Sequence, residues 1–195
     1  MSTRRFVIFL LGVWLGGSAF MYVVATHNLE SVDRVLGSPP AAAAKLIESL
    51  GPESARLLLR HHSSELNRVY FENWGLAQMV LGVAVFGMLL FGTREGKWPV
   101  VVSIVMLVTV ALMRFILTPD LVNFGRQLDF ATKQAGVAEH ARFVAVHRAY
   151  GVAEIAKCGL GLFLLALLLR RSQRKRRTVH DVHLVDDADD RRIDR

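Results

Sequence analysis

The chain lacks the residues and motifs on which many enzymes depend. Cys158 is the only cysteine among 195 residues, so no intramolecular disulfide can form and no metal site can be built from thiolates alone. A nucleophile elbow, a P-loop, a dinucleotide-binding glycine motif and an HExxH motif are all missing, and nothing resembles a catalytic triad. The sequence therefore favours a protein that is not an enzyme.

Charged side chains are missing from long stretches of the chain. Residues 6–25 contain none, and at 1.5 Å per residue they extend about 30 Å, the thickness of a hydrocarbon core. Three further apolar runs cover 74–92, 98–117 and 149–169. We therefore predict an all-α fold, an integral membrane four-helix bundle formed by residues 1–170.

A cleaved signal peptide is the alternative for the first run, because Arg4 and Arg5 precede it. The apolar part of a signal peptide is usually about 7–15 residues long. This run continues from Met21 to Val24 without a break. We therefore expect a retained membrane helix.

The connections between the spans differ in length. Residues 26–73 and 118–148 are long, and both contain helical signals. Residues 38–51 have a serine N-cap, early prolines and a terminal glycine, and 53–71 can form a helix that runs directly into the second span. Apolar residues recur at helical spacing over 121–131. We predict amphipathic surface helices in these two long loops, both outside the cell.

Basic residues cluster at the other ends of the spans, and the net charge is +7. The residues concerned are Arg4, Arg5, Arg94, Lys97 and the basic residues of Arg170–Arg177. The positive-inside rule predicts a cell-membrane protein with both termini in the cytoplasm. A basic cluster directly after a span favours contact with anionic lipid headgroups rather than nucleic acid. Residues 171–195 are highly charged and poor in apolar residues, which predicts a disordered cytoplasmic tail.

Several polar residues lie within or beside the spans. An ionised side chain at membrane depth costs several kcal/mol unless protein or water shields it. We therefore predict a pocket in the outer third of the membrane, lined by Gln78, Arg114, His147, Tyr150, Glu154 and Lys157, with Glu72 and Asn73 at its mouth. We expect an Arg114–Glu154 ion pair, with Lys157 paired to Glu72 or Gln78. These charges either bind a ligand, fix helix register only, or form a catalytic site.

Two histidines suggest a metal or haem site as an alternative. His27 follows the first span and His147 precedes the fourth, so both can lie at a similar depth on the outer side. No HxxxH or CxxCH pattern accompanies them. We therefore expect no cofactor, and keep haem or copper as the alternative. Gly12 and Gly16 form a GxxxG pattern that favours close helix packing within the bundle, or with another subunit.

The chain resembles a family of four-span membrane proteins, the transmembrane-protein-205-like family, which is classed as a domain of unknown function. The resemblance rests on GVWLGGSAF in the first span, ELNRVYFENWGLAQ at the entry to the second, and the exit of the third through Leu117-Thr118-Pro119. The approach to the fourth adds Arg142-Phe143, His147 and Glu154. It implies a multi-pass membrane protein and supplies no substrate.

The sequence thus predicts a binding or scaffold protein of unknown biochemical role. Its alternative is a haem- or copper-linked membrane redox protein. A homo-oligomer or a larger membrane complex remains open.

Overall fold

The computed structural model describes the backbone of residues 3–92, 96–129 and 137–193, and the side chains of 3–92, 96–129 and 138–170. Within these segments the regular structure is entirely helical. The elements are α1 Thr3–Gly37, α2 Ala41–Leu50, α3 Pro52–Phe91, α4 Lys97–Leu112, the π-helical turn η1 Met113–Leu117, α5 Thr118–Asp129 and α6 Val137–Ile193.

Four helical segments are long and apolar enough to cross a membrane, so the chain is a multi-pass membrane protein. They are Thr3–Gly37, Pro52–Phe91, Lys97–Asp129 and Ala138–Arg170. Each covers one predicted span, except that Gly92 of the second span caps the end of α3, and the all-α four-helix fold is confirmed. The helices are longer than the spans, because the 40 residues of α3 alone extend about 60 Å, twice the thickness of the hydrocarbon core.

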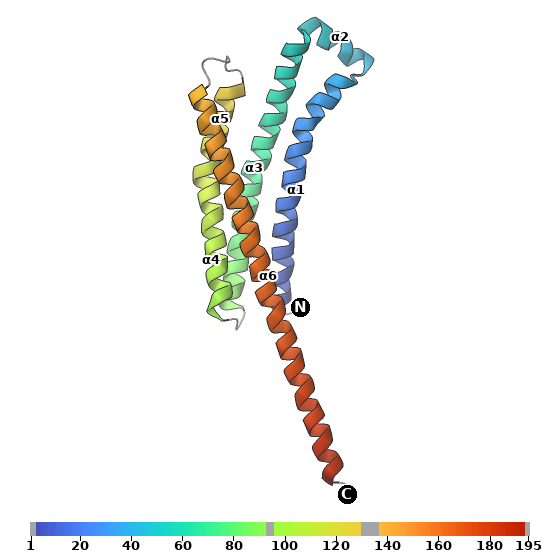
Figure 1. The fold of residues 1–195 in the computed structure, drawn as a ribbon, viewed down its shortest axis with the longest axis vertical. Helices are drawn as coiled ribbons and strands as arrows, with labels where there is room; N and C mark the ends of the chain where they lie inside the picture. The colour runs from blue at the N-terminus through green and yellow to red at the C-terminus, as the bar shows by residue number, and fades with distance from the viewer. Residues whose placement is uncertain (1–2, 93–95, 130–136, 194–195) are drawn as a thin grey trace.

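The four long helices form a ring in which each packs against two neighbours (Figure 1). α1 contacts α3 and α6, and α4 contacts the same two helices. α3 and α6 therefore face each other diagonally across the bundle axis. Both run in the same direction along the bundle (Figure 1), so successive residues of one face successive residues of the other.

The two ends of the bundle differ in what they carry. The N-terminus, the end of α3 and the start of α4 lie at one end, where α6 also leaves the bundle (Figure 1). We call this the terminal end. α2 and α5 lie at the opposite end, which we call the α2 end.

The interior is apolar towards the terminal end and polar further along. In α1 the buried residues Val7, Leu11, Trp14 and Ser18 recur every three or four positions, which places them on one helical face. The apolar core comprises Val7, Leu11, Trp14, Val85, Leu89, Val102, Met106, Val110, Leu164 and Leu168. The same stripes carry Ser18, Gln78 and Lys157 nearer the α2 end, so the core changes from apolar to polar along its length.

A π-turn joins α4 to α5. Pro119 has no N–H to donate to the carbonyl of Phe115, and its ring would crowd that carbonyl in a regular α-helix. The wider turn at Met113–Leu117 precedes it, and the Thr118 hydroxyl donates to the Met113 carbonyl at 2.8 Å. The third span therefore continues without a break into the outer helix α5.

The segments outside the spans are helical, as predicted. Residues 26–73 form the extensions of α1 and α3, joined through α2, and α5 packs against α6. Buried Asn67 of α3 donates to the Ala25 carbonyl at 3.1 Å and accepts from Asn28 at 2.8 Å, which ties the two extensions together. These contacts hold the extensions of α1 and α3 side by side.

Disorder of the tail, residues 171–195, stays a prediction from the sequence. The backbone of α6 continues as helix to Ile193 and projects beyond the terminal end of the bundle (Figure 1). Arginine, lysine and glutamine, which dominate 170–177, have high helix propensity, and this local preference favours continuation of the helix that precedes them.

Candidate binding site inside the bundle

Lys157 is the centre of a polar network on the bundle axis. Its side chain is only 1% exposed, although it lies within the most apolar part of α6. The ammonium group donates to Gln78 Oε1 of α3, to Ser18 Oγ of α1 at 3.3 Å and to Glu154 Oε1 of its own helix at 2.5 Å. A lysine ammonium has three donors, so all three are satisfied.

The network extends to a second donor from α1. Trp14 Nε1 donates to Gln78 Oε1 at 3.1 Å, so this amide oxygen accepts from an ammonium and from an indole. Three of the four bundle helices therefore meet at Gln78 and Lys157. Because a buried polar group without a partner is costly, this mutual satisfaction fixes the relative register of α1, α3 and α6.

Two polar atoms beside the network have no partner among the described residues. Trp74 Nε1 is a buried donor and Glu154 Oε2 is a buried acceptor, and neither makes a hydrogen bond there. Buried polar groups in proteins are nearly always paired with protein or with ordered water. The pair is therefore the strongest indication of an additional molecule in this part of the bundle.

The two unpaired atoms lie at the same level of the bundle. Phe71 of α3 packs edge-on against Tyr150 of α6, with ring centroids 5.7 Å apart, and about two turns further along Gln78 contacts Lys157. Trp74 lies between Phe71 and Gln78 in α3, just as Glu154 lies between Tyr150 and Lys157 in α6. An unmatched donor and an unmatched acceptor thus share one layer.

Trp74 reaches the interior because Gly17 leaves room for its ring. A Cβ at position 17 would come within 2.2 Å of Trp74 Cη2, so any side chain there would displace the indole. Gly17 precedes Ser18, which accepts from Lys157. The indole nitrogen of Trp74 is therefore buried inside the bundle.

The structure brings together four of the predicted pocket residues. Gln78, Lys157 and Glu154 form the network, and buried Tyr150 lies one turn from Glu154. The prediction that Lys157 pairs with Gln78 is confirmed, because the ammonium group donates to Gln78 Oε1.

Four other predicted residues lie outside the network. Glu72, Asn73 and His147 are exposed, so they do not line an interior pocket. Arg114 is half-buried, and its side chain lies across Gly75 of α3, where an added Cβ would come within 2.8 Å of its Cδ.

The predicted ion pairing has to be corrected. Glu154 pairs with Lys157, three residues along the same helix, and among the described residues it forms no ion pair with Arg114. The geometry of the π-turn supplies a reason, because Arg114 is part of Met113–Leu117, where the 3.6-residue periodicity used to assign its face does not hold.

The two histidines of the alternative haem or copper site are both exposed. The Nδ1 atom of His27 lies 3.0 Å from the carbonyl of Val23 in its own helix, and the His147 ring stacks on Phe143 with centroids 5.8 Å apart. Each side chain has a local contact on its own helix. No observation on these two residues favours a shared cofactor.

A second polar cluster joins α3 to α5 at the α2 end. His61, Glu65 and Asp129 place ligand-type atoms within 4.8 Å of one another. Arg68 Nη1, however, donates to Asp129 Oδ2 at 2.8 Å and to Glu65 Oε1 at 2.5 Å, and Arg126 donates to both oxygens of Glu65. The two guanidinium groups already balance the charge of the two carboxylates, so the arrangement fits a cluster of ion pairs better than a metal site. We call this cluster of Glu65, Arg68, Arg126 and Asp129 the ion-pair clasp.

The clasp changes the ionisation of its members. Hydrogen bonds from Arg126 and Arg68 lower the pKa of Glu65 to about 2, although burial opposes the change. Burial lowers the pKa of Arg68, but its contacts with Asp129 and Glu65 outweigh this and raise it overall. Both groups lie on the part of α3 that precedes the membrane span.

Sequence reasoning missed Trp14, Ser18 and Trp74. A signal was present, because Trp14 and Ser18 are four residues apart on one face of an otherwise apolar span, and both carry polar atoms that need partners there. The GxxxG pattern is not used within the bundle, and its packing with another subunit stays a prediction. A Cβ at Gly12 or Gly16 would meet nothing within 4 Å, so these glycines face away from the bundle, whereas Gly17 makes the close approach.

Comparisons of the chain with protein-family models, curated proteins and solved structures found no match.

Proposed function

We propose that this multi-pass membrane protein is a binding protein that holds one small, neutral, hydroxyl-bearing molecule between Trp74 and Glu154. One observation carries the proposal: a buried indole donor and a buried carboxylate acceptor, both unpaired among the described residues, lie in the same layer of the bundle. In this proposal the polar network binds a ligand, in addition to fixing the register of the helices.

The chemistry of the two atoms defines the ligand class. A hydroxyl group can donate to Glu154 Oε2 and accept from Trp74 Nε1 at the same time. The adjoining Lys157–Glu154 pair is neutral overall when both groups are ionised, so a charged ligand would leave an uncompensated charge in a low-dielectric interior. The ligand is therefore a small alcohol or polyol.

The position of the site suggests access from outside the cell. We propose that the chain lies in the cell membrane with the terminal end in the cytoplasm, because Arg4, Arg5, Lys97 and Arg170 gather at that end. The Trp74–Glu154 layer then lies in the outer half of the membrane. A four-span architecture of this kind agrees with the resemblance to the transmembrane-protein-205-like family, which we keep as part of the proposal.

Native mass spectrometry of the full chain, extracted in mild detergent, tests the proposal. The wild-type protein should retain one small molecule per chain. Trp74→Phe keeps a ring against Gly17 but removes the donor, and Glu154→Gln puts an amide group where the carboxylate accepts, so each should lower occupancy at least tenfold. Trp98→Phe is the matched control, because Trp98 is exposed at the end of a different span.

Two results would contradict the proposal. If the wild-type protein retains no molecule apart from detergent and bulk phospholipid, ordered water is sufficient to pair the two atoms. If Trp74→Phe and Trp98→Phe retain the molecule equally, the molecule binds elsewhere.

A further inference from the structure

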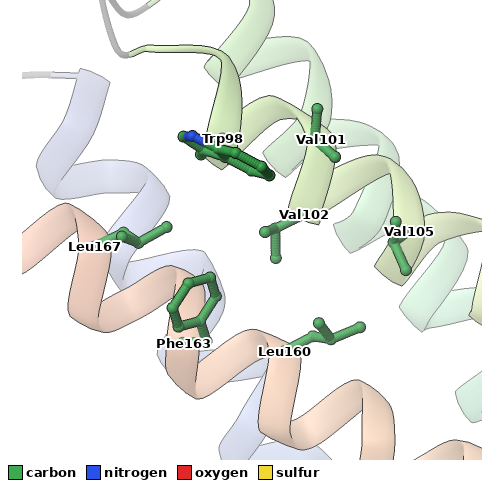
Figure 2. A pocket seen from close by; sticks show the side chains of 7 residues that line it. All are labelled: Trp98, Val101, Val102, Val105, Leu160, Phe163 and Leu167. Carbon is green, nitrogen blue, oxygen red and sulfur yellow. The ribbon is translucent and has the colours of Figure 1, made fainter.

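An apolar groove of about 350 Å³ runs between α4 and α6, near the terminal end of the bundle. Figure 2 shows Trp98 and Leu167 together at one end, Val102 facing Phe163 in the middle, and Val105 beside Leu160 at the other end. The two helices are antiparallel, so each end of the groove is formed by one residue pair. None of the residues of the polar network contributes to it.

The groove opens to the outside of the bundle. The side chains of Trp98, Val105 and Phe163 are 60%, 45% and 53% exposed, and all three lie within membrane-crossing segments. In a bilayer this surface is covered by hydrocarbon or by another protein. The groove is therefore a binding surface for an apolar group.

The size of the groove favours a hydrocarbon chain over a helix. From Leu160 to Leu167 the groove extends about 10 Å along α6. A helix is about 10 Å wide, so it would lie across the open side of the groove and not within it. A narrow, flexible chain can fill it, whereas a helix could insert only single side chains.

Positive charges stand at one end of the groove. The ammonium group of Lys97 lies 6.0 Å from the centre of the Trp98 ring, and Arg170 follows Leu167 by one helical turn. Both residues are exposed. They lie at the terminal end, beyond the apolar lining, where the phosphate of a phospholipid would meet them. At the opposite end of the groove the lining remains apolar.

We propose that this groove binds one anionic phospholipid, with an acyl chain between α4 and α6 and its headgroup phosphate at Lys97 and Arg170. The inference differs from general attraction of the basic tail to a membrane surface. It assigns a single lipid to defined residues, and it does not depend on the proposed ligand of the polar network.

The test compares two phospholipids on the purified full-length chain by native mass spectrometry. Phosphatidylglycerol and phosphatidylcholine with identical acyl chains are titrated into delipidated protein. We expect one phosphatidylglycerol to bind at least tenfold more tightly than phosphatidylcholine. Lys97→Gln with Arg170→Gln should remove this preference, because each basic residue near the surface contributes about fivefold. Lys45→Gln with Arg60→Gln, which removes equal charge at the α2 end, should preserve it.

A groove-filling variant tests the position of the acyl chain. Val105→Phe should lower the affinity for both phospholipids about tenfold, since the partly exposed Val105 can be enlarged at the expense of the groove. Val83→Phe, at an exposed position of α3, is the matched control and should bind as the wild type does.

Equal affinity for the two lipids would overturn the proposal, as would equal affinity of Val105→Phe and Val83→Phe. A dimer that Val105→Phe dissociates would instead assign the groove to a second copy of the chain. A stably bound partner protein that Val105→Phe releases would assign it to a helix of that partner, and either result would replace the lipid.

Discussion

At the scale of single residues, the ammonium group of Lys157 brings together acceptors from α1, α3 and α6. Each acceptor is itself buried or half-buried, so none can turn to water when the lysine is removed. The ammonium and the Glu154 carboxylate also neutralise each other in a low-dielectric interior. Removing one partner of the Lys157–Glu154 pair should therefore lower the free energy of unfolding, because the other charge is left buried and unpaired. This loss of stability can be measured.

Replacing Lys157 by methionine should destabilise the protein by about 3–5 kcal/mol, because it leaves the Glu154 carboxylate without its counter-charge. The double variant Lys157→Met with Glu154→Leu should recover a large part of this loss, since no buried charge then remains. Unfolding of purified protein in mixed micelles, followed by circular dichroism, gives the free energies. Lys45→Met on the exposed surface of α2 should cause little change, and a Lys157→Met protein as stable as wild type would contradict the assigned pairing.

The residues of the site were only partly predictable. Glu154 and Lys157 could be found because a charge in an apolar run is conspicuous and needs a partner. Gln78 was one of two partners expected for Lys157, but Ser18 and Trp14 were missed, because pairing depends on which helices are neighbours and which are diagonal. Gln78 meets Lys157 across the bundle axis, and Trp74 reaches the interior only because residue 17 is glycine. Both contacts join different helices, so they cannot be predicted from the sequence of one helix.

At the scale of elements, helix type was predictable and helix extent only in part: the helix over 53–71 that runs into the second span was expected, and the length of α1 was not. Runs of about 20 apolar residues fix the number of spans, because hydrocarbon provides no partners for an unpaired backbone. The ends of α1, α3 and α5 depend on contacts outside the membrane. Asn67 fastens α3 to α1, and the ion-pair clasp of Arg68 and Asp129 fastens it to α5. Such contacts carry no signature in a single sequence.

The clasp should make the attachment of α5 to α3 sensitive to acid. The pKa of Glu65 is lowered from 4.5 to about 2, chiefly by its hydrogen bond from Arg126. A carboxyl group with a depressed pKa stabilises the folded state above its unfolded pKa, and this contribution is lost as the pH falls from about 4.5 towards 2. Glu65→Gln should therefore be less stable than wild type at pH 7, and the difference should disappear near pH 2.

Thermal unfolding of the two proteins over this pH range provides the measurement. The neighbouring groups His61, Arg68 and Asp129 are present in both proteins, so their own titration largely cancels in the comparison. Glu53→Gln, at an exposed position near the start of α3, is the control and should follow the wild type at every pH. A difference between Glu65→Gln and wild type that stays constant from pH 7 to pH 2 would contradict the assigned clasp.

At the scale of the whole molecule, the bundle has two chemically different ends. The terminal end collects basic residues and is followed by the basic part of α6, whereas the α2 end carries acids and bases in similar number. Translocation across a membrane is disfavoured for short segments rich in lysine and arginine. This asymmetry, and not the shape of the bundle, decides which way the protein faces.

Single-cysteine labelling tests this orientation directly. In a Cys158→Ala background, a cysteine at Ser38 should react with a membrane-impermeant maleimide in intact cells, because Ser38 is exposed between α1 and α2. A cysteine added after Arg195 should react only once the membrane is permeabilised. The unsubstituted Cys158→Ala protein controls for background labelling. The reverse pattern would place the Trp74–Glu154 layer on the cytoplasmic side, and the ligand of the polar network would then have to come from inside the cell.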